Sequence, residues 1–237
     1  MSKLYAGLTT NGVTELTLQE EGVGNIGTQT IVWDGTTNGV IDQVQGDILD
    51  NWKSGGGIKQ LQIGSSCTNI GSYAFYFCLD LTGDLVIPDS VTSIGDYAFF
   101  YCQDFDGTLT IGNSVMSIGY SAFSDCSGLT GSLVIPNSVT TIGNYAFVYC
   151  GLTGDLVIPD SVTSIGSYAF FGCAGLTALY TNTPAASWTG TNALFSTTAL
   201  VNIYYGPNTN DGAGYSATFQ GGSGMTVSAW TNYPNVP

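Results

Sequence analysis

The chain has 237 residues, of which 43% are hydrophobic and only 8% are charged, and its formal net charge is −14. The three basic residues are Lys3, Lys53 and Lys59, so residues 61–237 contain no Lys, Arg or His. Nucleic acid is therefore excluded as a partner, because phosphate neutralisation requires Lys or Arg. The same deficit argues against docking on anionic lipid.

The termini bear on where the protein is found. No stretch approaches 18 consecutive apolar residues, so we expect no membrane insertion. Residues 1–10 lack the apolar core of a secretory signal. We expect either that a signal has been removed or that the protein leaves its cell by another route.

Residues 1–60 show no repeat and are predicted to form an N-terminal cap or anchoring segment. A strand is expected at Thr14–Leu18. An amphipathic helix is expected from Gly39 to Trp52, followed by Gly55–Gly57 as a stop. Its apolar face would cover the first open coil and would consist of Val40, Ile41, Val44, Ile48, Leu49 and Trp52.

Residues 61–178 contain five copies of one repeat of about 24 residues. The second copy, Leu85–Cys102, matches the fifth, Leu156–Cys173, at 16 of 18 positions. The others are Leu61–Cys78, Leu109–Cys126 and Leu133–Cys150. The copies share the pattern L-x-I-[PG]-x-S-V-x-x-I-G-x-x-A-F-x-x-C, and we number them coils 1 to 5.

Each copy is predicted to form one coil of a superhelix. Leu85 and Ile87 alternate with Val86, which is the period-2 pattern of a short strand with one buried face. Pro88 then turns the chain, and Ile94 re-enters the core. One coil cannot bury these residues alone, so neighbouring coils about 4.8 Å away must cover them. The predicted fold is a repeat solenoid, mainly β with short turns or helical segments, between an N-terminal and a C-terminal cap.

Residues 179–237 break the period and are predicted to form the C-terminal cap. A strand is expected at Leu200–Tyr205, and Gly206-Pro207 is typical of a turn.

The motif I-P-x-S-V-T-x-I-G-x-x-A-F-x-x-C resembles the BspA-type (Treponema-type) leucine-rich repeat. The resemblance covers residues 61–178, and the stretch Ile203–Pro207 is similar to the capping region of that family. It implies a non-catalytic solenoid used for adhesion or protein recognition, often on bacterial or protist surfaces and sometimes in phage proteins.

One cysteine per copy occupies the same repeat position, and these residues should line up along the solenoid: Cys78, Cys102, Cys126, Cys150 and Cys173. A straight row supplies no tetrahedral zinc cluster, and parallel side chains fit disulfide geometry badly. We predict structural, buried free thiols and no metal site. Some disulfide remains an alternative.

Catalysis is difficult to assemble from these residues, so we predict no enzyme and no cofactor. His is absent, which removes the commonest general base. Asp104 and Asp106 form the most obvious carboxylate pair, but they fall in a linker and are best explained as a solvated turn. An adventitious calcium ion is the alternative there.

Tyrosines provide the candidate binding site. Tyr73, Tyr97, Tyr145 and Tyr168 share one repeat position, which Ser121 interrupts, and Tyr101 and Tyr149 share another. Stacking between coils explains such rows structurally. A contact strip for protein or carbohydrate is the functional alternative, since Tyr is favoured at interfaces.

Two functions remain open. The first is a surface-exposed interaction or adhesion module whose solenoid binds a protein or glycan on another surface, at the cell surface or outside the cell. The second is a structural component of a virus or phage particle, such as a capsid decoration or tail fibre protein on the virion surface. A homo-oligomer is compatible with either, and a trimer would favour the particle.

Overall fold

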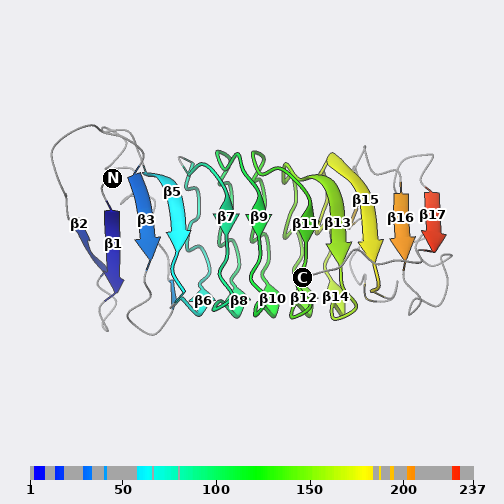
Figure 1. Ribbon diagram of the computed structural model, residues 1–237, viewed down its shortest axis with the longest axis horizontal. Coiled ribbons are helices and arrows are strands. Elements are labelled where there is room, and N and C mark those ends of the chain that lie inside the picture. Colours follow the sequence, from blue (N-terminus) through cyan, green and yellow to red (C-terminus); the bar gives the residue numbers. More distant parts are fainter. Residues whose placement is uncertain are drawn as a thin grey trace.

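The computed structural model describes residues 3–8, 14–18, 29–33, 40–41, 58–65, 67–79, 81–183, 187, 193–194, 202–205 and 226–229. The regular elements of these residues are strands, and they follow one another along an elongated body (Figure 1). Among the described residues there is no α-helix. The predicted leucine-rich-repeat solenoid is confirmed as a mainly β structure.

Each coil contributes two short strands to two parallel rows, which Figure 1 shows side by side along the long axis. The first row consists of β5 (Ile58–Ile63), β7 (Leu85–Val86), β9 (Leu109–Thr110), β11 (Leu133–Val134), β13 (Thr153–Ile158) and β15 (Gly175–Thr181). The second consists of β4 (Val40–Ile41), β6 (Asn69–Ile70), β8 (Ser93–Ile94), β10 (Ser117–Ile118), β12 (Thr141–Ile142) and β14 (Ser164–Ile165).

Equivalent residues of successive coils pair directly. Ile94 lies opposite Ile118, and Leu133 lies opposite Leu156. Because the strand pairings between successive coils of the repeat are parallel and in register, a residue type repeated in the sequence becomes a row along the solenoid.

The core is a row of five phenylalanine rings flanked by aliphatic rows. The rings are at most 1% exposed and stack at centroid distances of 5.0 to 5.3 Å, and they belong to Phe75, Phe99, Phe123, Phe147 and Phe170. In the linker after coil 2, Phe105 is completely buried where other linkers place Leu81 or Leu129. Burial of this continuous row stabilises all five coils together.

Acidic and polar side chains at the surface bind the coils to one another. The Asp84 carboxylate accepts hydrogen bonds from the backbone N–H and the hydroxyl of Thr108 at 2.7 and 2.9 Å. The Asp96 carboxylate accepts one from the Tyr120 N–H at 2.7 Å. These carboxylates therefore join one coil to the next. Their hydrogen bonds are charge-assisted and so stronger than bonds between neutral groups.

The N-terminal segment continues the two rows of strands. The expected strand is confirmed as β2 (Thr14–Leu18), which pairs antiparallel with β1 (Lys3–Leu8). β3 (Gln29–Trp33) then pairs in parallel with β1 and β5. The helix expected from Gly39 is wrong at its start, because Val40–Ile41 form strand β4 beside β6. Residues 42–52 of that expected helix lie outside the described residues.

The C-terminal segment extends the first row. The expected strand is confirmed as β16 (Asn202–Tyr205), which pairs in parallel with β15, and β17 (Thr226–Ala229) pairs with β16. The predicted Gly206-Pro207 turn lies outside the described residues. The boundaries of the two caps stay predictions.

Candidate functional site

Two positions in each coil have a left-handed backbone, and most of them carry large side chains. The first set is Tyr73, Tyr97, Ser121, Tyr145 and Tyr168, and the second is Phe77, Tyr101, Asp125, Tyr149 and Gly172. The non-glycine members have φ between 48° and 63°. Residues other than glycine rarely adopt this backbone conformation, and each such residue costs about 1–3 kcal/mol of folding free energy.

The surrounding backbone enforces this conformation. The Tyr97 N–H donates to the Tyr120 carbonyl at 2.8 Å, and the Tyr101 N–H donates to the Ser124 carbonyl at 2.8 Å. Each turn of one coil is thereby fixed to the turn of the next. Tyrosine is retained at positions where glycine would be less strained, which indicates that the ring itself is useful.

The tyrosines of the first set form a continuous stack of rings with Tyr120, which replaces the ring missing at Ser121 and is tilted by 52° and 56° against its neighbours. Successive centroids lie 5.0, 5.1, 5.5 and 5.1 Å apart. We call this stack the tyrosine wall, and it consists of Tyr73, Tyr97, Tyr120, Tyr145 and Tyr168. Sequence comparison missed Tyr120 because it lies one residue before the repeat position.

The second set is broken in the middle. Phe77 stacks on Tyr101 at 4.7 Å, but coil 3 has Asp125 at the next position. The Asp125 carboxylate accepts a hydrogen bond from the Ser124 hydroxyl at 2.7 Å. The predicted site residues Tyr101 and Tyr149 therefore lie two coils apart, on either side of a carboxylate.

The aromatic surface is partly open to solvent. Tyr73, Phe77, Tyr120 and Tyr149 are 38–53% exposed, whereas Tyr97, Tyr101, Tyr145 and Tyr168 are half-buried. Burial is the largest of the effects that raise the pKa of Tyr97, followed by the neighbouring Tyr120. Its hydroxyl therefore stays protonated at neutral pH and can donate a hydrogen bond.

The cysteine row lies inside the solenoid and not on this surface. Cys78, Cys102, Cys126, Cys150 and Cys173 are buried free thiols. The Cys126 thiol donates to the Phe99 carbonyl at 3.1 Å, and Cys102 and Cys173 make the equivalent bond. Burial raises the pKa of Cys150 to about 12 and that of Cys102, Cys126 and Cys173 well above the ordinary value. These protonated thiols are poor nucleophiles and poor metal ligands.

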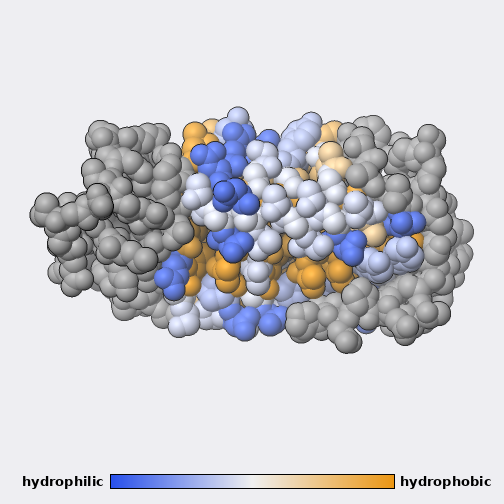
Figure 2. All heavy atoms as spheres, turned by 45° about the horizontal axis from the view of Figure 1, so that its top comes forward, coloured by the Kyte–Doolittle hydropathy of each residue, from blue (hydrophilic) through white to orange (hydrophobic). Residues whose placement is uncertain are grey.

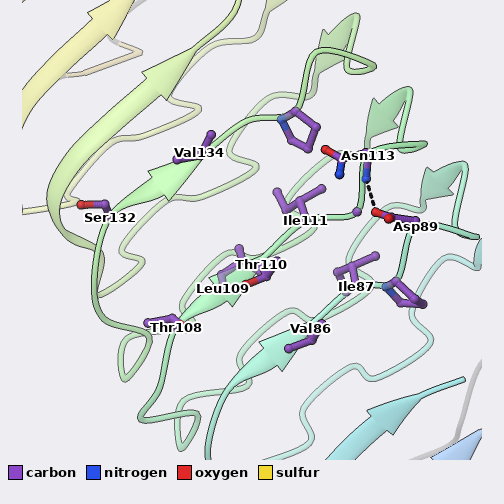
Figure 3. Close-up of a pocket in the computed structure, with 13 residues that line it drawn as sticks. Val86, Ile87, Asp89, Thr108, Leu109, Thr110, Ile111, Asn113, Ser132 and Val134 are labelled. Atoms are coloured by element: carbon purple, nitrogen blue, oxygen red, sulfur yellow. Dashed lines mark hydrogen bonds between the residues drawn. The ribbon is translucent and has the colours of Figure 1, made fainter. Parts of the chain in front are cut away.

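A second surface feature is a groove on the outer face of the first strand row. It is a cavity of about 540 Å³ over β7, β9 and β11, from which Val86, Thr110 and Val134 project outward (Figure 3). Val86 is 51% exposed and Val134 is 36% exposed. The space-filling view shows hydrophobic patches in a row along the long axis, bordered by hydrophilic ones (Figure 2). Val86 and Val134 give the groove its exposed apolar surface. The one carboxylate in its lining, Asp89, accepts a hydrogen bond from the Asn113 N–H.

The Asp104 and Asp106 pair does not form a joint site. Asp106 accepts a hydrogen bond from the Gly83 N–H at 2.7 Å, and both residues are exposed. Within the described ranges, no group of three or more His, Cys, Asp or Glu is arranged to hold a metal ion. No helix in the described part of the chain is long and apolar enough to cross a membrane.

Comparison with known proteins agrees with this geometry. The model of the BspA-type leucine-rich repeat region matches residues 52–177 and 107–219, with six copies. The chain belongs to the BspA-type leucine-rich repeat family. The matches reach beyond the five copies seen in the sequence, toward both ends, where the strand rows also continue.

Solved structures of bacterial proteins are similar to this BspA-type chain. A leucine-rich repeat protein of Treponema pallidum is 22% identical with a TM-score of 0.55, over 83% of this chain and 86% of that protein. A leucine-rich cell surface protein of Faecalibacterium prausnitzii is 30% identical with a TM-score of 0.42, over 60% of this chain and 43% of that protein. A leucine-rich repeat protein of Bacteroides ovatus is 18% identical with a TM-score of 0.39, over 97% and 76%. No curated protein matches the chain.

Membership in the BspA-type family fits the functional class expected from the sequence. Leucine-rich repeat solenoids typically serve as protein-interaction or surface modules and not as enzymes. The Treponema pallidum structure supports the fold alone.

Proposed function

We propose that this protein is a non-enzymatic recognition or adhesion module, displayed outside its cell, that binds a protein on another surface through the tyrosine wall. The observation that carries the proposal is a row of five rings, four of them on strained left-handed backbone, that is partly open to solvent. Tyr is favoured at protein interfaces because it provides a large, rigid contact area and a hydroxyl.

The orientation of the rings favours a protein over a glycan. Tyr73 and Tyr97 stack with an interplanar angle of 13°, and Tyr145 and Tyr168 stack with an angle of 7°. Rings stacked on one another cover each other's faces and present edges and hydroxyls to a partner. A sugar ring packs on an exposed aromatic face, which the stacked sides of these two pairs do not offer. Tyr120, between the pairs, is tilted by 52° and 56° against its neighbours.

The experiment measures binding of the labelled chain to cell envelopes. Envelopes are tested intact, after protease treatment and after periodate oxidation of glycans. We expect binding that protease removes and periodate spares. Loss after periodate alone would support a glycan partner and contradict the proposal.

A wall variant tests which face binds. Tyr73→Ser, Tyr120→Ser and Tyr168→Ser combined should abolish binding, and Ser121 shows that serine tolerates the left-handed backbone of Tyr73 and Tyr168. The matched control changes the groove, with Val86→Thr and Val134→Thr, because Thr110 occupies that position naturally. If the groove variant loses binding and the wall variant keeps it, the wall is not the binding face.

A structural role in a virus particle is the second candidate function, favoured by the low charge and the richness in Gly, Thr, Asn and Tyr. Co-sedimentation with purified virions, together with failure to bind any envelope, would support it and overturn the proposed function.

A further inference from the structure

Coil 3 interrupts the aromatic surface at three neighbouring positions. Asp125 occupies the position of Tyr101, Ser124 that of Phe100, and Ser121 that of Tyr97. Tyr120 restores the ring in the tyrosine wall, but no ring restores the second set. The result is a notch with a carboxylate between two aromatic residues.

The backbone places Asp125 in the same orientation as its aromatic counterparts. Its φ is 59°, compared with 63° at Tyr101 and 52° at Tyr149. Its N–H donates to the Val148 carbonyl at 2.8 Å, as the N–H of Tyr101 does to Ser124. The Asp125 side chain therefore leaves the backbone toward the same surface as the two rings, and it is half-buried there.

The rings on either side of the notch each pack against a ring on the side away from coil 3. Tyr101 stacks with Phe77 of coil 1, which leaves its opposite face directed toward coil 3. The ring of Tyr149 lies where a Cβ at position 172 would be, so Gly172 makes room for it on the side away from coil 3. Tyr149 is the most exposed of the aromatic residues on this surface, at 53%.

The width of the notch suits a flat cationic group. Two coil spacings of about 4.8 Å separate the positions of Tyr101 and Tyr149. A planar group between two rings requires about 3.5–4.0 Å on each side, which is less than two coil spacings and leaves room for such a group. Arginine combines a flat guanidinium, which stacks on aromatic faces, with a fork of N–H donors for a carboxylate.

The charge of the chain points to the same occupant. Residues 61–237 contain no basic residue that could neutralise Asp125 from within the repeats. Ser124 engages one carboxylate oxygen, and the other accepts no hydrogen bond from the described residues.

We infer that Asp125, Tyr101 and Tyr149 form a subsite for an arginine side chain of the protein partner. The inference rests on the proposed function for the identity of the partner, but the subsite can be tested without one. The probe is N-acetyl-arginine amide, titrated at low salt against the folded chain. The ring resonances of the tyrosines, labelled with ¹³C, report binding.

We expect shifts concentrated at Tyr101 and Tyr149, with a Kd on the order of 10 mM. N-acetyl-citrulline amide, the uncharged analogue, should bind at least about fivefold more weakly, and Asp125→Asn should weaken the arginine probe to a similar extent. Asp104→Asn is the matched control, because it removes the same charge from the same region, and it should leave the affinity unchanged. Asp125→Tyr should fill the notch and abolish the shifts.

Equal weakening by Asp104→Asn and Asp125→Asn would show diffuse attraction and overturn the subsite. Equal shifts with the citrulline probe would also overturn it. Failure of the subsite is separate from failure of the proposed function. If Asp125→Asn binds envelopes like the unmodified chain while the wall variant does not, the proposed function stands and the subsite is wrong.

Discussion

The buried thiols should make the protein unusually sensitive to alkali. Burial raises the pKa of Cys150 from its ordinary value of 9.0 to about 12. A thiol whose pKa is raised in the folded state stabilises the fold fully below pH 9 and loses this contribution as the pH rises toward the folded pKa. In the unfolded chain the same thiol ionises near pH 9, so alkali favours unfolding.

The magnitude follows from the size of the shift. Each such thiol removes about 1.4 kcal/mol of unfolding free energy for every pH unit above 9. For Cys150 the window between 9.0 and about 12 corresponds to about 4 kcal/mol. Cys102, Cys126 and Cys173 are shifted in the same direction, so four thiols together remove about 5–6 kcal/mol per unit. A typical stability of about 5–15 kcal/mol would therefore be lost between about pH 10 and 12.

The assay is urea unfolding followed by circular dichroism, at steps from pH 7.5 to 10.5, without oxygen and with a reductant. Cys150→Ser removes one titrating thiol and should make the decline with pH about a quarter shallower. Val139→Ala, at a fully buried site, should lower stability at every pH without changing the slope. A slope that is the same in Cys150→Ser and the unmodified chain would refute the reasoning.

Three further predictions concern the packing of the coils. Gly143→Ala would place a Cβ 2.7 Å from the backbone carbonyl of Gly119, and it should cost about 1–3 kcal/mol of unfolding free energy in urea; a neutral result would contradict the close approach. Phe123→Ala should cost about 3–5 kcal/mol by the same measurement, because its ring is fully buried between two others, and a cost below 1 kcal/mol would contradict that stacking. Hydrogen bonds from the N–H and hydroxyl of Thr108 lower the pKa of Asp84, so the carboxylate stabilises the fold above pH 3.8 and loses this effect as the pH falls through the folded pKa. The difference between the urea midpoints of Asp84→Asn and the unmodified chain should therefore be smaller at pH 2.5 than at pH 6, and a difference that is the same at both pH values would contradict this role.

The coil itself could be predicted from the sequence because equivalent residues in successive copies have the same surroundings. The 24-residue spacing of Cys78, Cys102, Cys126 and Cys150 predicts that equivalent residues lie next to one another. The parallel pairing of the strands places them in this way. The alternation of Leu85, Val86 and Ile87 correctly separates buried from exposed side chains.

The ends were harder to predict because their structure depends on a neighbour. Val40 and Ile41 fit a helical face and a strand equally well, since short apolar runs satisfy both periodicities. The edge of β6 offers backbone partners at that place, and the segment pairs with it. No local pattern contains this information.

The candidate site was predicted in composition but not in arrangement. The repeat positions of Tyr97 and Tyr145 are evident from alignment, whereas the left-handed backbone and the direction of the rings are not. Tyr120 lies outside the repeat position, so only the structure shows that its ring belongs to the tyrosine wall. The importance of Asp125 appears only once Tyr101 and Tyr149 are seen to flank it.

In-register pairing also makes the coil a unit of length. Removing residues 109–132 would bring Thr108 directly before Leu133, and every row of equivalent residues would become shorter by one coil. The shortened chain would also lose Asp125, so Tyr101 and Tyr149 would become neighbours. Gain or loss of a whole repeat during evolution therefore changes the length of the solenoid by one coil. The same event can add or remove the carboxylate on the aromatic surface.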